Sequence, residues 1–303
     1  MKRRFHLPPW WLRTRTVLTE SLKAWIEQRA ASKGAALAFY TLFSMTPILV
    51  LAIAVAGYFF GAEAAQGEII IQMQGLVGPN GAQAIQALLA AAQDPASGLV
   101  ATILASVLLL VGATSVFAEL KGSLDEMWGI RKFRRSSFGT LVRTRLLSFG
   151  LVLVLAFLLL ISLVVSASLA VLERYAGGIW SSSGDVLSAI SSLISFGVIA
   201  FLFAVIYKML PDVRLSWRDV WTGAIFTAGL FGLGKYAIGL YLGNSAVASG
   251  FGAAGSVVAL LVWVYYSAQI FFLGAEFTRQ YALWFGSLQR ERRRLQAHAP
   301  LVR

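Results

Sequence analysis

Ionisable side chains at the ends of, or inside, long apolar runs are the residues of this sequence that could do chemistry. Lys235 interrupts one such run, and Glu119 and Glu276 lie at the ends of two others. A charge at membrane depth is costly unless it meets water or a partner, so such residues mark either pathways or internal ion pairs. A lysine could attract an anionic headgroup or carboxylate, whereas a glutamate at a helix end could hold that helix to a basic neighbour.

Lys235 allows two interpretations. It lies 14 residues beyond Trp221, which is about 21 Å along a helix. It could face a water-filled cavity and attract an anionic substrate, or it could extend its ammonium group to the outer interface. We favour the cavity, because an anchoring lysine would more naturally lie at the end of the helix. Glu119 and Glu276 are expected to form inner-face ion pairs with the basic residues Lys208, Arg143 and Arg145.

Polar residues inside the apolar runs complete the candidate pathway. Tyr266 and Gln269 are three residues apart and share a helix face. Tyr40 and Ser44 precede Pro47, which cannot donate a backbone hydrogen bond and therefore favours a kink or break. Broken helices line substrate sites in transporters, but ordinary interhelical hydrogen bonds and a kinked, closed bundle would also explain these residues.

Enzyme chemistry has little support in the sequence. There is no cysteine, and the two histidines, His6 and His298, lie in charged terminal segments. The adjacent Asp125 and Glu126 do not face each other on a helix, and no phosphate-binding loop motif occurs. A GxGxxG match at 250–255 lies in a predicted exterior turn, without the strand that the dinucleotide fingerprint requires. We therefore expect no catalytic residue, no metal and no cofactor, and a membrane-associated nuclease is the least favoured function.

The elements that carry these residues are predicted to be membrane-spanning helices. Of 303 residues, 58% are hydrophobic and 13% are charged, against about 25% charged in soluble proteins. A spanning helix needs about 20 apolar residues, and several runs meet this length. The predicted fold is an all-α, polytopic membrane helix bundle with six spans, at about 35–61, 97–118, 146–172, 186–207, 221–242 and 256–276.

The distribution of basic residues predicts the orientation of these spans. Of 26 lysines and arginines, 24 fall in alternate connecting segments or the two ends of the chain, and only Arg174 falls on the other side. By the positive-inside rule both termini are cytoplasmic. The net charge of +12 then indicates contact with anionic headgroups and not with nucleic acid. The expected organisation is a cytoplasmic segment 1–33, a membrane domain 34–278 and a basic tail 279–303, and homo-oligomer formation stays open.

Two further segments are predicted to be helical. From Trp10 to Ala30 apolar residues recur at near-helical spacing between charges, so this helix either lies in the inner headgroup layer or covers the bundle from below. The loop at 62–96 is apolar for an exterior loop, and Pro79 with Asn80 suggests a turn between two short helices. These helices could form a lid over a cavity or simply cover the bundle. The two halves of the chain share no motif that can be aligned, so the inverted repeat of many transporters is missing.

Several motifs together resemble one family. The first is the stretch from Ala35 to Pro47, which reads AALAFYTLFSMTP. The second is the stretch from Tyr207 to Arg214, which reads YKMLPDVR and is followed by Trp217 and Gly223-Ala224. The others are the loop from Leu124 to Arg145 and the triplet Gly274-Ala275-Glu276. They are similar to the YihY/BrkB family of bacterial inner-membrane proteins, once labelled ribonuclease BN, over about residues 20–280. The family has a tyrosine-glycine pair where this chain reads Gly250-Phe251-Gly252. The resemblance implies an inner-membrane location and a role in envelope integrity, with no agreed substrate.

Two main functions remain open. The first is a transporter or flippase-like protein for a lipid-like or small anionic substrate, and it predicts a polar cavity that reaches Lys235. The second is a non-transporting scaffold or interaction protein of the cell envelope, and it predicts a dry, apolar interior. The candidate pathway residues are Lys235, Tyr40, Ser44, Pro47, Tyr266 and Gln269.

Overall fold

The computed structural model describes residues 10–92, 115–116, 118–129, 184–211, 213, 215–244 and 255–289. The described residues form helices and their connections and contain no strand, so the all-α prediction is confirmed for them. The helices are α1 (Trp10–Glu27), α2 (Ala30–Phe60), α3 (Ala62–Ala92), α6 (Gly184–Met209), α7 (Trp217–Asn244) and α9 (Gly255–Trp284). A short helical segment at 118–127 lies between α3 and α6 in the sequence.

Four predicted spans coincide with described helices. The spans 35–61, 186–207, 221–242 and 256–276 correspond to α2, α6, α7 and α9, whereas 97–118 and 146–172 lie mostly or wholly outside the described residues. Two helices contain a stretch long and apolar enough to cross a membrane, Ser192–Met209 in α6 and Val257–Trp284 in α9. The total of six spans therefore stays a prediction.

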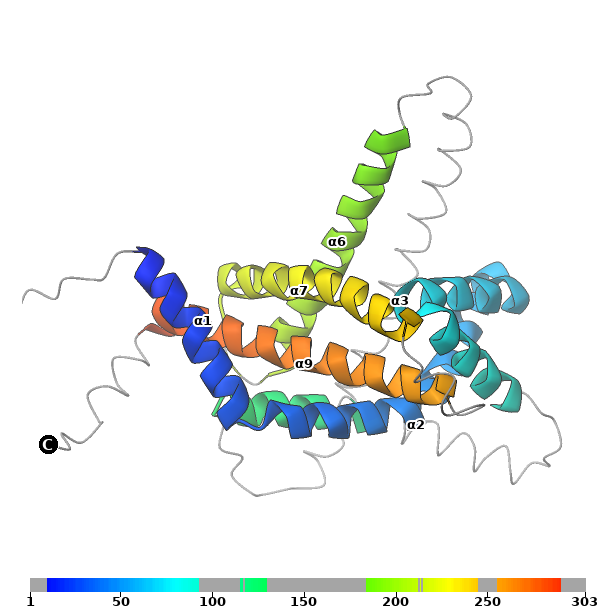
Figure 1. Cartoon of the computed structure of the whole chain (residues 1–303), viewed down its shortest axis with the longest axis horizontal. Helices are drawn as coiled ribbons and strands as arrows, with labels where there is room; N and C mark the ends of the chain where they lie inside the picture. Colours follow the sequence, from blue (N-terminus) through cyan, green and yellow to red (C-terminus); the bar gives the residue numbers. More distant parts are fainter. Residues whose placement is uncertain are drawn as a thin grey trace, which may run out of the picture.

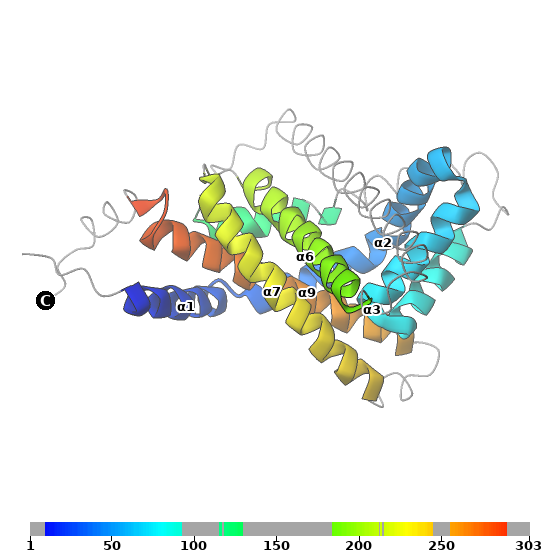
Figure 2. The same ribbon diagram turned by 90° about the horizontal axis from the view of Figure 1, so that it is seen from above.

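Helix α9 lies at the centre of the described bundle. It packs against α1, α2, α3 and α7, and α6 packs against α7 and also contacts α9 through Tyr207. In Figure 1, α9 runs between α7 and α2, and α1 crosses near one of its ends. Figure 2 shows the same bundle from above, where α7 crosses α9 at an angle. Any site inside the bundle must therefore be built on α9.

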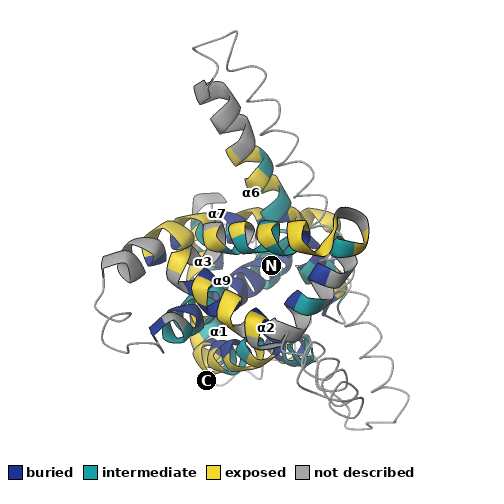
Figure 3. Cartoon of the chain, turned by 90° about the vertical axis from the view of Figure 1, so that its right-hand side faces the viewer, coloured by how far each residue is buried: buried dark blue, intermediate teal, exposed yellow. Residues whose placement is uncertain are grey.

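Burial follows this arrangement. Phe272 and Ala275 of α9 are completely buried, together with Tyr207 of α6 and Val220 of α7. A second apolar cluster joins Leu49 and Ile53 of α2 to Ile85 and Leu89 of α3 and Leu260 of α9. Large apolar side chains also cover outward surfaces, with Tyr58, Leu193, Leu233 and Tyr236 each more than 70% exposed. In Figure 3 the buried residues gather inside the bundle and the exposed ones lie on its outer faces. This is the pattern of a helix bundle whose outer surface faces lipid.

The turn predicted at Pro79 and Asn80 is wrong. The structure has one helix, α3, from Ala62 to Ala92, and it includes Pro79. A proline inside a helix removes one backbone bond and crowds the carbonyl four residues earlier, here that of Gly75. The helix absorbs this by changing direction along its length, as Figure 1 shows. The segment 62–92 is thus a single bent helix that packs on α2 and α9.

The N-terminal helix packs against the bundle, as one of the two interpretations of its sequence predicts. Val17 and Ser21 are 1% exposed on the side of α1 that packs against α9, whereas Leu18, Leu22 and Ile26 are 40–67% exposed. Helix α1 therefore covers one end of the bundle and still presents a second apolar stripe outward. A sharp corner joins it to α2, where Arg29 adopts a left-handed backbone conformation with φ of 54°.

Candidate functional site

A repeated pentapeptide fixes how α7 crosses α9. Residues 223–227 read GAIFT and residues 274–278 read GAEFT. In each copy the threonine hydroxyl donates a 2.7 Å hydrogen bond to the carbonyl of its own glycine, Thr227 to Gly223 and Thr278 to Gly274. The two copies meet antiparallel, because a Cβ on Gly223 would lie 1.8 Å from Thr278 Oγ1 and one on Gly274 would lie 1.9 Å from Thr227 Oγ1.

Aromatic rings complete this crossing. Phe226 and Phe277, the fourth residues of the two copies, stack with their centroids 4.0 Å apart. The Tyr207 hydroxyl of α6 lies 3.1 Å from Thr227 Oγ1 and donates a 2.8 Å hydrogen bond to the carbonyl oxygen of Phe271. The crossing therefore joins three helices, and a cavity lies further along the same α7 and α9 pair.

The cavity has a volume of about 320 Å³ and lies between α1, α7 and α9. Its lining is mostly apolar and consists of Trp25, Leu230, Leu233, Gly234, Ala237, Tyr266, Gln269, Ile270 and Leu273. None of these nine residues is charged. Leu233 is 72% exposed, so the cavity reaches the outward apolar face of α7, which faces lipid in a membrane-spanning bundle.

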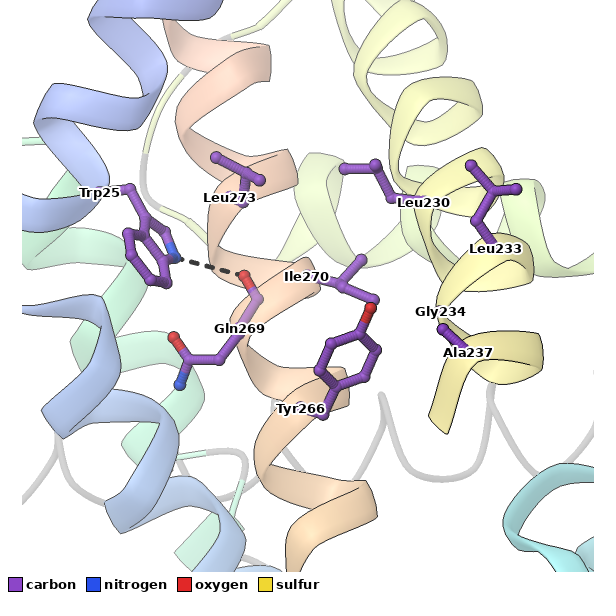
Figure 4. Close-up of a pocket in the computed structure, with 9 residues that line it drawn as sticks. All are labelled: Trp25, Leu230, Leu233, Gly234, Ala237, Tyr266, Gln269, Ile270 and Leu273. Atoms are coloured by element: carbon purple, nitrogen blue, oxygen red, sulfur yellow. Dashed lines mark hydrogen bonds between the residues drawn. The ribbon is translucent and has the colours of Figure 1, made fainter. Parts of the chain in front are cut away.

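Two residues predicted from the sequence, Tyr266 and Gln269, border this cavity. Figure 4 shows Tyr266 turned toward α7 and Gln269 turned to the opposite side of α9, toward α2. Gly234 lets Tyr266 fit, because a Cβ on this glycine would lie 2.5 Å from the tyrosine ring. Trp25 closes the α1 side, and its indole nitrogen donates a 3.3 Å hydrogen bond to the carbonyl oxygen of Gln269. Tyr266 and Gln269 thus both border the cavity, but their side chains point to different helices and do not form the shared face predicted from their spacing.

The structure does not bring the other predicted pathway residues to this cavity. Ser44 is buried and donates its hydroxyl to the carbonyl of Tyr40 at 2.7 Å, so it is satisfied within α2. Tyr40 is 40% exposed. Pro47 lies within the helical span of α2, and its side chain is outside the described residues. Lys235 follows Gly234 in α7 but is exposed and is not part of the lining. This position favours interfacial extension of the Lys235 ammonium over the cavity role.

No predicted inner-face ion pair is formed within the part of the chain that the structure describes. Glu276 is completely buried, and its basic neighbour among the described residues is Arg279, whose Nη1 lies 3.9 Å from Oε2. Glu119 lies 3.4 Å from the Ser123 hydroxyl. Lys208 donates to the carbonyl of Leu215 and lies over the Trp217 ring at 5.6 Å. The other two expected partners, Arg143 and Arg145, lie outside the described residues.

Different polar contacts hold the described helix ends together. Arg279 Nη1 donates a 2.8 Å hydrogen bond to the carbonyl of Met127, and Lys121 Nζ donates a 3.0 Å bond to the carbonyl of Leu210. These bonds join the 118–127 segment to α9 and α6. These two hydrogen bonds could not be predicted from the sequence, because every residue has a backbone carbonyl and the sequence does not indicate which one accepts the bond.

The start of α7 is tied to the turn after α9 in a similar way. Asp219 is 3% exposed and accepts hydrogen bonds from the Ser287 backbone nitrogen at 2.8 Å and from its hydroxyl at 2.7 Å. A Cβ on Gly286 would lie 2.1 Å from Asp219 Oδ1, so the turn needs glycine to come this close.

Comparison with known proteins defines the family. The family model described as Virulence factor BrkB matches residues 21–298, which include every described helix except residues 10–20 of α1. The chain belongs to the Virulence factor BrkB family. Its relatives include proteins named UPF0761 membrane protein from Verminephrobacter eiseniae (29% identical, 88% of this chain) and Pseudoalteromonas translucida (26% identical, 89% of this chain). No solved structure matches the chain.

Family membership shows that this is a membrane protein, and the named relatives carry no enzymatic name. The match spans 62% of the Verminephrobacter relative, 61% of a relative from Albidiferax ferrireducens and 85% of the Pseudoalteromonas relative. The resemblance inferred from the motifs is therefore confirmed. The GAIFT and GAEFT copies both include a glycine-alanine pair from those motifs, and the structure explains why this BrkB-family chain needs small residues there.

Proposed function

We propose that this BrkB-family protein is a flippase-like transporter that admits a lipid-like amphiphile from the bilayer into the cavity between α1, α7 and α9. The observation that carries this proposal is the cavity itself. Its apolar wall reaches the outward face of α7 through Leu233, and the Tyr266 hydroxyl supplies a polar group. An acyl chain would contact the apolar wall, and the polar part of the amphiphile would meet the tyrosine hydroxyl.

The charge of the lining favours a lipid-like substrate over a small free anion. A small anion needs a cation or several N–H donors to replace its hydration shell, and the nine lining residues contain no cation. The volume of about 320 Å³ is near the lower end of ligand pockets, so the cavity would hold part of a lipid and leave the rest in the bilayer.

The proposal includes a location in the bacterial inner membrane with both termini cytoplasmic. The exposed stripe of Leu18, Leu22 and Ile26 would then lie in the cytoplasmic headgroup layer, near anionic lipids. Reporter fusions test this orientation. Fusions at Arg134 and Ala297 should report the cytoplasm, and fusions at Ala92 and Ala254 should report the exterior. A cytoplasmic signal at Ala92 would contradict the scheme.

Reconstitution into vesicles tests the transport activity. Purified protein is placed in liposomes that contain a fluorescent lipid, and the fraction of label reached by an external quencher is followed over time. Gly234→Ala should slow translocation several-fold, because its Cβ would meet Tyr266 at 2.5 Å and Ile270 at 2.7 Å, both in the cavity wall.

Gly232→Ala is the matched control. It makes the same change in the same helix, but its Cβ would meet nothing within 4 Å, so translocation should be unchanged. If Gly234→Ala and Gly232→Ala translocate lipid at equal rates, the cavity takes no part in translocation. If the parent protein moves no lipid across a range of headgroups, the transport proposal fails and a non-transporting envelope scaffold becomes the better function.

A further inference from the structure

Helix α1 presents a row of apolar side chains on the side that faces away from the bundle. Leu18, Leu22 and Ile26 follow one another at intervals of four residues, so they lie along one side of the helix. They are 40%, 50% and 67% exposed. The side that packs against α9 differs, because Val17 and Ser21 are each 1% exposed there. A row of exposed apolar side chains indicates a surface that contacts something besides water.

Two arginines border this row. Arg15 precedes Leu18 by three residues on α1. Arg29 follows Ile26 by three residues, in the corner between α1 and α2. Both arginines are exposed, and neither forms an ion pair with another described residue. The α1 stripe is defined here as Arg15, Leu18, Leu22, Ile26 and Arg29.

The charge of the α1 stripe complements an anionic surface. The stripe carries two positive charges and no negative charge. The acidic residues of α1, Glu20 and Glu27, lie on the far side of the helix by its period of 3.6 residues. Lys23, the nearest lysine, is paired with Glu20 at 3.1 Å. The two arginines therefore remain available to an anionic partner that also accepts apolar side chains.

The composition and position of α1 favour a lipid surface as that partner. Five of its 18 residues are charged, and among the described helices only α6 and α9 contain a stretch able to cross a membrane. In Figure 1, α1 runs across the direction of α2 and α9, near one end of α9. A charged amphipathic helix in this position lies in the headgroup layer, with its apolar side toward the acyl chains. Arginine can then form paired hydrogen bonds to a lipid phosphate.

We propose that the α1 stripe binds anionic lipid headgroups of the cytoplasmic leaflet. Leu18, Leu22 and Ile26 insert among the acyl chains, and Arg15 and Arg29 contact the phosphates. The inference takes the cytoplasmic orientation from the proposed function, but it does not depend on transport. A second copy of the chain fits less well, because it would bring the same two arginines to the contact with no acidic residue on the stripe to balance them.

A fluorescent label on the full chain tests this docking. The chain has no cysteine, so Leu22→Cys provides one position for an environment-sensitive NBD label. The labelled protein is placed in nanodiscs of phosphatidylcholine, either alone or mixed with anionic phosphatidylglycerol. Emission should be several-fold higher and shifted to the blue in the anionic discs, and added salt should reverse the gain because it screens the charges. Nanodiscs expose both faces of the bilayer, so the result depends neither on orientation nor on transport.

A label at Glu20→Cys is the matched position control. The Glu20 side chain is 42% exposed, which is similar to the 50% of Leu22, but it lies about 160° away around the helix axis. Its emission should stay that of a label in water in both lipid mixtures. A Leu22 label that emits equally strongly in both mixtures would overturn the proposal, because protein would then cover the stripe. Emission that rises only in discs holding two copies would overturn it in favour of a second copy.

Charge variants of the Leu22→Cys protein test the arginines. Arg15→Gln should weaken docking about fivefold, which corresponds to about 1 kcal/mol per basic residue at an anionic surface. It should fold normally, because Arg15 is exposed and glutamine has a similar helix propensity. Arg15→Lys should keep most of the docking. Lys23→Gln removes the same charge off the stripe and should cost less, so equal losses for Arg15→Gln and Lys23→Gln would refute the assignment.

The outcomes for docking and for transport are separable. Docking in nanodiscs by a protein that moves no lipid in liposomes would refute the transport proposal and support the α1 stripe. Translocation by a protein whose Leu22 label never responds to anionic lipid would refute the α1 stripe and leave the transport proposal intact.

Discussion

Because α7 crosses α9 at Gly223, a glycine-to-alanine substitution should lower stability at Gly223 but raise it at Gly229 on the same helix. Replacing glycine by alanine inside a helix stabilises it by about 0.8–1 kcal/mol through backbone entropy. At Gly223 the new Cβ would lie 1.8 Å from Thr278 Oγ1 and 2.7 Å from its Cβ. Both atoms belong to the packed crossing, where the threonine hydroxyl is bonded to the Gly274 carbonyl at 2.7 Å. Overpacking of this kind costs about 1–3 kcal/mol.

Gly223→Ala should therefore lower the free energy of unfolding by up to about 2 kcal/mol after the helix gain is subtracted. Gly229→Ala is the control on the same helix, because its Cβ would meet nothing within 4 Å, and it should raise stability by up to about 1 kcal/mol. The apparent Tm of the two purified variants should differ by about 5 °C. Far-UV circular dichroism would verify that both remain helical.

A double substitution tests whether the threonine contact is the cause. Thr278→Ala removes the two outer side-chain atoms that a Cβ at Gly223 would meet within 3.0 Å. The double variant Gly223→Ala with Thr278→Ala should thus be more stable than the sum of the two single effects, with a coupling of about 1 kcal/mol. The reasoning is refuted if Gly223→Ala is as stable as Gly229→Ala, or if the two substitutions are additive.

Three further substitutions test other contacts. Tyr207→Phe should lower stability by about 1–3 kcal/mol, measured by thermal unfolding, because it leaves a buried carbonyl and the Thr227 hydroxyl without the tyrosine partner. Asp219→Ala should lower Tm by several degrees through loss of both bonds from Ser287, whereas Asp219→Asn, which keeps one acceptor oxygen, should have a smaller effect. Lys235→Met should leave lipid translocation unchanged if the exposed lysine only extends to the interface, and a loss of translocation with normal folding would restore its predicted cavity role.

The sequence by itself determined the class of the protein and the position of its main helices. Continuous apolar runs without charges are long enough to predict helices, and α2, α6, α7 and α9 follow four of them closely. The motifs around Pro47, Pro211 and Gly274 were sufficient to identify the family. These properties depend on local composition and spacing, which a single chain displays directly. Local composition also predicted a turn at Pro79, and that prediction was wrong, because the packing of α3 on α2 and α9 supports a bent helix through the proline.

Only the tertiary structure decided which polar residues share a site. Tyr266 and Gln269 were predicted as a stripe, but the close approach of Gly234 and the contact of Trp25 determine that they line a cavity. Glu276 was expected to pair with distant basic residues, and the structure instead shows it buried beside an arginine that is bonded to a carbonyl. The repeated GA-x-FT pentapeptide was present in the sequence, yet its meaning depends on two helices crossing antiparallel, so that each glycine lies opposite the other copy's threonine. Residue types record which groups are available, whereas the distances that convert them into a site arise from helix packing.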